Sequence, residues 1–163
     1  MTTSTNAIIC YGITFPDEYQ FPWDTDELTG EDAIKDWWLY KICGYTDPFE
    51  LYNTEGNWLD GQCPPDERVS EYFQTQRDFL KEHPVPVSLV CHCSGEYPMW
   101  IVTAPGTIIT AYRGEPKIIT SHYATRQHYQ LLIEFCSRYC QPLNEYDKMP
   151  KLAPQWYLSS FWG

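Results

Sequence analysis

The stretch VSLVCHCSGEYPMWIVTAPGTIITAY, residues 87–112, decides the fold class. It contains three short runs, 87–93, 99–104 and 107–112, that are rich in the β-branched and aromatic residues typical of strands. The turn-forming pairs Ser94-Gly95 and Pro105-Gly106 separate these runs. Closely spaced strands with short turns predict an antiparallel meander, extended by a shorter strand at 117–120.

Outward from this stretch, the patterns are mostly helical. Residues 7–15 predict a first strand, and a helix follows Thr29 and ends near Gly44. A second helix opens near 64–66, and a third runs from about 125 to 140. This order predicts one α+β domain over residues 1–163, with about three helices packed against an antiparallel sheet whose second half is the meander.

Composition restricts the class of protein further. Of 163 residues, 43% are hydrophobic and 17% aromatic, which is enough for a packed core. No apolar run reaches the length of a membrane span, and no basic segment precedes the first apolar stretch as in a secretory signal. Seven cysteines without such a signal indicate reduced thiols, so we expect a cytoplasmic protein that does not bind membranes.

The net charge of −11 is unevenly distributed. Residues 1–82 contain 17 Asp and Glu against five Lys and Arg, a net charge of −12, whereas residues 83–163 carry a net charge of +1. A field of this sign repels nucleic acids and attracts basic surfaces. We therefore expect no direct binding of nucleic acid, which requires a basic footprint.

The acidic segment from Asp17 to Asp36 is interleaved with aromatic residues, and this combination is typical of interfaces in which rings anchor a partner and charges steer it. We expect it to bind and inhibit a basic macromolecular target, for example by occupying a groove that normally holds nucleic acid. If Trp37 and Trp38 belong to the core, the acids serve only solubility. The residues predicted to contact the partner are Asp17, Glu18, Tyr19, Trp23, Asp24, Asp26, Glu27, Glu31, Asp32 and Trp37.

Three other functions stay open. Basic and aromatic residues of the second half could bind a nucleotide signal, because arginine pairs with phosphate and rings stack on bases. Those residues are Trp100, Tyr112, Arg113, Lys117 and Arg126. A structural role in a virion is another possibility. The chain contains none of the common catalytic motifs, so no catalytic residue is predicted; a small metal- or histidine-dependent hydrolase is the remaining enzymatic alternative.

One set of cysteines could bind zinc. Cys91 and Cys93 lie two apart on a strand, and Cys136 and Cys140 lie four apart on a helix, so each pair should share one side of its element. If the helix packs on that face of the sheet, the four thiolates could surround the ion. The spacing is not that of common zinc sites, and core cysteine is the default interpretation, so no cofactor is expected. His92, between Cys91 and Cys93, should point to the opposite face.

Several segments resemble a group of small, uncharacterised acidic proteins encoded by tailed bacteriophages. The segments that carry the resemblance are Tyr11-Gly12, Phe21-Pro-Trp23, Trp37-Trp38, Ser94-Gly-Glu-Tyr-Pro-Met99, Ala104-Pro-Gly-Thr107 and Trp156-Tyr-Leu-Ser-Ser-Phe-Trp-Gly163. The resemblance implies an accessory protein that acts in the bacterial cytoplasm on host or defence machinery. It implies no catalytic residues.

Overall fold

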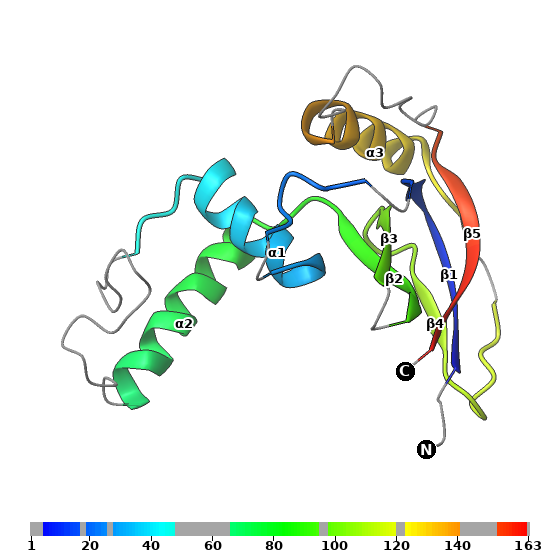
Figure 1. Ribbon diagram of the computed structural model, residues 1–163, viewed down its shortest axis with the longest axis horizontal. Coiled ribbons are helices and arrows are strands. Elements are labelled where there is room, and N and C mark those ends of the chain that lie inside the picture. Colours follow the sequence, from blue (N-terminus) through cyan, green and yellow to red (C-terminus); the bar gives the residue numbers. More distant parts are fainter. Residues whose placement is uncertain are drawn as a thin grey trace. The chain divides into compact units, whose positions relative to one another are not determined.

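The computed structural model describes residues 5–16, 19–25, 28–47, 66–94, 98–119, 123–140 and 153–162. Its elements in chain order are β1 (Thr5–Thr14), α1 (Gly30–Trp37), the π-helix η1 (Trp38–Ile42), α2 (Asp66–Glu82), β2 (Ser88–Ser94), β3 (Pro98–Thr103), β4 (Ile109–Ala111), α3 (Arg126–Tyr139) and β5 (Gln155–Trp162) (Figure 1). The chain divides into two compact units. Unit 1 is Met1–Ala33 with Pro86–Gly163, and unit 2 is Ile34–Val85. The single-domain organisation expected from the sequence stays a prediction.

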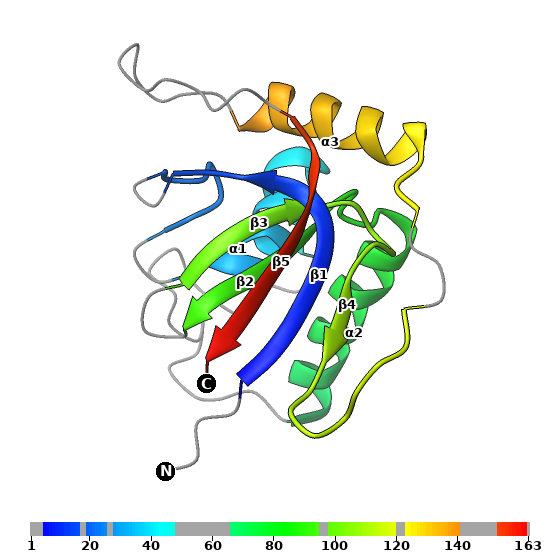
Figure 2. The same ribbon diagram turned by 90° about the vertical axis from the view of Figure 1, so that its right-hand side faces the viewer.

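Strand β1 organises the sheet of unit 1, because it pairs along both of its edges. One edge pairs antiparallel with β5 over Thr5–Gly12. The other edge pairs with β4 over Ala7–Ile9 and with β3 over Gly12–Thr14, again antiparallel. Figure 2 shows β1 curving along its whole length. The described strands therefore form a five-stranded sheet in the order β3-β2-β5-β1-β4, with an additional pairing between β3 and β1.

Residues 104–108, between β3 and β4, do not take part in the ladder with β1. Hydrogen bonds of Thr107 hold these residues against β1. The Thr107 hydroxyl donates to Ala104 O at 2.7 Å and accepts from Tyr11 N at 3.3 Å. Ala104 N donates to Tyr11 O at 3.1 Å. Because these bonds satisfy backbone groups that the ladder leaves unpaired, β3 and β4 can both follow the same edge of β1.

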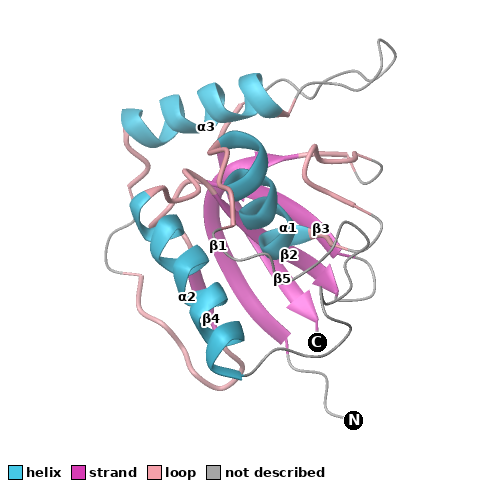
Figure 3. Cartoon of the chain, turned by 90° about the vertical axis from the view of Figure 1, so that its left-hand side faces the viewer, coloured by secondary structure: helices cyan, strands magenta, loops and turns pink. Residues whose placement is uncertain are grey.

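The pairings of β1, β5, β2 and β3 close on themselves, because β2 also pairs parallel with the end of β5. A core of Ile8, Cys10, Val90 and Ile101 fills the inner side, with Tyr157 and Phe161 packed against it. Helix α3 lies across the end of the strands in Figures 2 and 3. Its buried residues are Leu132, Phe135 and Cys136.

Helix α3 begins where the sequence predicts it. The side chain of Thr125 accepts from His128 N at 3.3 Å, and Thr125 N donates to His128 Nδ1 at 3.2 Å. This reciprocal arrangement is a capping box in which histidine replaces the usual glutamate or glutamine. His128 therefore has a structural role at the start of the helix.

Unit 2 contains the end of α1, then η1 and α2. Cys43 N donates to Trp38 O at 2.9 Å, the spacing of a π-turn. Tyr40 OH donates to Asp47 Oδ2 at 2.8 Å, and Gln76 Nε2 donates to Tyr40 OH at 2.8 Å. These bonds connect η1, the segment after it and α2. Burial and the bonds to Tyr72 and Asp47 raise the pKa of Tyr40, so its hydroxyl stays protonated and can donate.

The α+β class predicted from the sequence is confirmed. The strand order differs from the expected meander, since β2 and β3 form a hairpin but β4 pairs with β1. The reason is the excursion at residues 104–108, which carries the chain along β1 rather than back along β3. Residues 117–119 of the expected last strand are not in a strand, and Thr120 lies outside the described residues. Packing of all three helices on the sheet stays a prediction.

Candidate functional site

The segment that follows β1 folds back on itself around three aromatic rings. Tyr19 N donates to Pro16 O at 2.9 Å, which forms the first turn. The rings of Phe15, Tyr19 and Phe21 pack against one another with centroid distances of 4.7 to 5.0 Å. Phe21 also stacks on Trp23 at 4.8 Å. Contacts between rings at these distances hold Phe15, Tyr19, Phe21 and Trp23 in a defined arrangement.

A pocket of about 190 Å³ opens between this segment and the start of β3, entirely within unit 1. Its volume is several times the roughly 30 Å³ that one water molecule occupies in the liquid. Aromatic rings form much of the wall, and a carboxylate and a hydroxyl supply polar atoms. The lining residues are Phe15, Pro16, Tyr19, Phe21, Asp24, Thr29, Met99 and Trp100.

Asp24 supplies the one carboxylate among the described residues that line this pocket. Phe21 N donates to Asp24 Oδ2 at 3.2 Å, and Asp24 N donates to Phe21 O at 3.1 Å. Oδ1 is buried and has no hydrogen-bond partner among the described atoms. Burial raises the pKa of Asp24, and hydrogen bonds from the amides of Phe21 and Gly30 partly oppose that rise. The pocket therefore contains an acceptor that a cationic group could satisfy.

Trp100 reaches the pocket because Gly30 leaves room for it. A Cβ atom on Gly30 would overlap Cη2 and Cζ2 of the Trp100 ring. Gly30 also has a φ of +72°, which L-residues rarely adopt. Glycine at the first position of α1 thus permits close contact between the indole and the backbone.

The structure separates the residues that the sequence assigned to the acidic interface. Tyr19 and Asp24 line the pocket, whereas Glu31 and Asp32 are exposed on the first turn of α1. Trp37 is half-buried, and its ring lies 6.3 Å from that of Trp38. Asp17, Glu18, Asp26 and Glu27 lie outside the described residues.

The prediction that Trp23 is a surface anchor is wrong. Its side chain is only 2% exposed, and it packs between Phe21 at 4.8 Å and Phe135 of α3 at 6.1 Å. The burial has a simple cause, because the turn at 21–24 directs the indole inward while Asp24 lines the pocket. Trp23 therefore supports the pocket from behind.

The residues proposed for a nucleotide ligand do not lie together at this pocket. Trp100 lines it, but Tyr112, Arg113, Lys117 and Arg126 are exposed and are not among its described lining residues. The Asp24 carboxylate would repel a phosphate placed beside Trp100. Sequence reasoning linked Trp100 to these basic residues and missed its contact with Gly30. The one available signal was a glycine at the start of a predicted helix.

The four-cysteine zinc site is not assembled. Cys136 on α3 and Cys140, which caps the end of that helix, are fully buried, and Cys91 and Cys93 are half-buried on β2. In the part of the chain that the structure describes, no three His, Cys, Asp or Glu side chains are placed to hold a metal together. The hydrogen bond with Cys136 and burial raise the pKa of Cys140, as for thiols in a core.

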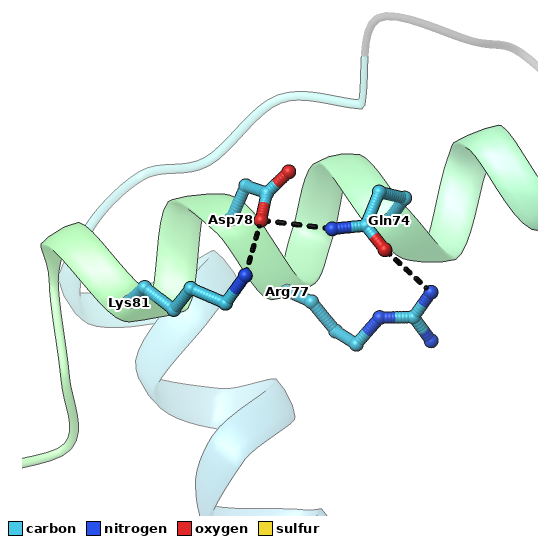
Figure 4. Close-up of polar contacts among 4 residues, drawn as sticks. All are labelled: Gln74, Arg77, Asp78 and Lys81. Atoms are coloured by element: carbon cyan, nitrogen blue, oxygen red, sulfur yellow. Dashed lines mark hydrogen bonds and ion pairs between the residues drawn. The ribbon is translucent and has the colours of Figure 1, made fainter.

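Of the acids of α2, those whose burial the structure describes are exposed to solvent: Glu67, Glu71, Asp78 and Glu82. Asp78 Oδ1 accepts from Gln74 at 2.8 Å and from Lys81 at 2.7 Å, and Arg77 donates to Gln74 Oε1 at 3.0 Å (Figure 4). The bond from Gln74 and the pairing with Lys81 lower the pKa of Asp78, which is fully exposed. Such a network adds little to stability.

The raised pKa of Asp24 gives a pH-dependent prediction. The folded protein holds this proton more tightly than the unfolded chain, so ionisation costs stability as the pH rises above the ordinary value of 3.8. Asp24→Asn removes this cost, because the amide does not ionise. Urea denaturation at a series of pH values should show that the stability of the variant relative to wild type increases as the pH rises above 3.8. A difference that does not change with pH would show that the Asp24 site does not favour the proton.

Along the described residues, no helix has both the length and the apolar character needed to cross a membrane. Comparison of the chain with protein-family models, curated proteins and solved structures gives no match.

Proposed function

We propose that the protein binds a basic protein partner, with a lysine side chain of that partner entering the pocket and pairing with Asp24. The observation that carries the proposal is that Asp24 lines a pocket walled by aromatic rings while its Oδ1 atom is buried without a hydrogen-bond partner among the described atoms. An ammonium group there would gain a charge-assisted hydrogen bond and attraction to the faces of the surrounding rings. Its aliphatic stem would contact Met99 and Trp100.

Lysine fits this carboxylate better than arginine. Oδ2 of Asp24 already accepts from Phe21 N, so Oδ1 is the oxygen left without a partner among the described atoms. Arginine typically pairs with a carboxylate through two parallel bonds that need both oxygens, whereas an ammonium group is a point charge that one oxygen can satisfy.

The surrounding charge supports a basic partner. Glu31 and Asp32 are exposed at the start of α1, close in sequence to the pocket residue Thr29. The first 82 residues carry a net charge of −12, which would speed the approach of a basic surface. Inhibition by occupying a nucleic-acid groove of the partner extends this binding proposal, because an acidic rim suits a basic groove. The phage resemblance implies that this partner belongs to the host or defence machinery.

Titration calorimetry with a peptide of alternating glycine and lysine tests the proposal. Asp24→Asn keeps an acceptor for Phe21 N but removes the charge, and it should weaken binding roughly tenfold or more. Glu115→Gln removes the same charge from an exposed position away from the pocket lining and is the matched control. Its effect should be less than about twofold, since exposed charges contribute little.

Two further peptides identify the ligand chemistry. Acetylation of the lysines removes their charge and should abolish binding, whereas an arginine peptide should bind more weakly than the lysine peptide. If Asp24→Asn and Glu115→Gln weaken binding equally, the attraction is only that of a negatively charged protein for a positive peptide, and the proposal is wrong.

A further inference from the structure

Cys93 on β2 has an unusual backbone. Its φ is +74°, and it is the one non-glycine residue with a positive φ among those the structure describes. An L-residue in this region is strained, and such strain is concentrated at functional sites. Cysteine, unlike asparagine or aspartate, is not a residue type that commonly adopts this conformation.

This backbone conformation changes which side chains lie together. In a regular strand, His92 and Cys93 would point to opposite faces, as the sequence analysis expected. Instead, Cys93 Sγ lies 3.3 Å from His92 Nδ1. The prediction that His92 points away from Cys93 is therefore wrong, because the positive φ interrupts the alternation of the strand.

A third soft donor completes the cluster. Cys93 Sγ lies 3.2 Å from Met99 Sδ, contributed by the facing strand β3, whose Met99 pairs with His92 in the ladder. All three side chains are partly exposed, so an ion could reach them from solvent. The Cys93 thiol thus contacts both an imidazole nitrogen and a thioether at the end of the β2–β3 hairpin.

We propose that His92, Cys93 and Met99 bind one Cu(I) ion. Thiolate and thioether ligands favour Cu(I), and imidazole also suits copper. Zinc is bound by thiolate, imidazole and carboxylate rather than thioether, so Met99 distinguishes the two metals. Binding displaces the thiol proton of Cys93 to solvent and uses the unprotonated Nδ1 atom of His92. Met99 also lines the pocket at Asp24, but Asp24 is not among the three ligands. Cu(I) binding is measured without the lysine peptide, so its failure would leave the lysine proposal untouched.

Competition with the chelator bicinchoninate, under anaerobic and reducing conditions, measures Cu(I) affinity. Any of the seven cysteines could bind Cu(I), so substitution of a cysteine would not identify the site. Met99→Leu leaves every thiol in place and conserves volume, so the fold should tolerate it. We expect this variant to bind Cu(I) at least roughly tenfold more weakly than wild type.

Met149→Leu, which removes a thioether elsewhere in the chain, is the matched control and should bind as wild type does. His92→Gln gives an independent second variant with an expected loss of similar size. Zn(II) affinity should be the same for Met99→Leu and wild type. Equal Cu(I) affinity of Met99→Leu and Met149→Leu, with both proteins folded by circular dichroism, would overturn the proposal.

Discussion

Trp23→Ala is expected to destabilise unit 1 by about 3–5 kcal/mol, the range observed when a large aromatic side chain is removed from a core. Trp23 is 2% exposed and packs on Phe21 and on Phe135 of α3. Its loss would leave a cavity between the acidic segment and α3. Urea denaturation followed by circular dichroism measures the effect.

Trp156→Ala is the matched control, because this tryptophan is 40% exposed and its ring contacts Tyr11 at 5.4 Å. Because Trp156 is less buried, its removal should lower the free energy of unfolding by less, about 1 kcal/mol. Equal destabilisation by the two substitutions would contradict the placement of Trp23 in the core. The result also matters for binding studies, since lost binding in Trp23→Ala would reflect a damaged pocket wall.

Gly12→Val is expected to cost about 3 kcal/mol or more, the upper part of the range for overpacking a core. Gly12 pairs with Thr103 of β3 along one edge of β1 and with Gln155 of β5 along the other. The pairing with β5 ends at this residue, and the pairing with β3 begins there. A Cβ atom there would overlap Val102 O and lie 2.8 Å from Ile101 Cγ2. Backbone cannot move aside as the end of a flexible side chain can, so the β1–β3 pairing should weaken.

Ala7→Val is the control for strand propensity, since Ala7 is exposed on the same strand. A β-branched residue suits an exposed strand position, so stability should change by less than about 0.5 kcal/mol. Thermal and urea denaturation of wild type, Gly12→Val and Ala7→Val measures the change in stability that each substitution causes. A Gly12→Val protein as stable as wild type would mean that β3 does not approach β1 as closely as the structure has it.

Local patterns predicted the class of fold and most element positions. The third helix was expected over about 125–140 and runs over Arg126–Tyr139, because its cap and its apolar stripe are both local signals. The β1–β3 pairing was not predictable in the same way. It depends on contact between residues about ninety positions apart and on an excursion of five residues, 104–108, that resembles an ordinary turn in sequence.

The candidate sites show the same limit. Acidic and aromatic composition indicated Tyr19 and Asp24, but the same composition also suggested Trp23, which is buried. Trp100 joins the pocket through a tertiary contact with Gly30 that no spacing reveals. The regular alternation of a strand wrongly predicted that His92 points away from Cys93. Cysteine is not a residue type that commonly has a positive φ, so nothing in the sequence indicated the conformation at Cys93.

Chemical-shift mapping with the glycine–lysine peptide determines whether the pocket around Asp24 receives a cationic side chain. We predict shifts at the Trp100 indole N–H, the Met99 methyl group and the Thr29 amide, and their absence in Asp24→Asn. Shifts confined to Tyr112, Arg113 and Arg126, or spread evenly over the acidic surface in both proteins, would contradict the proposed binding.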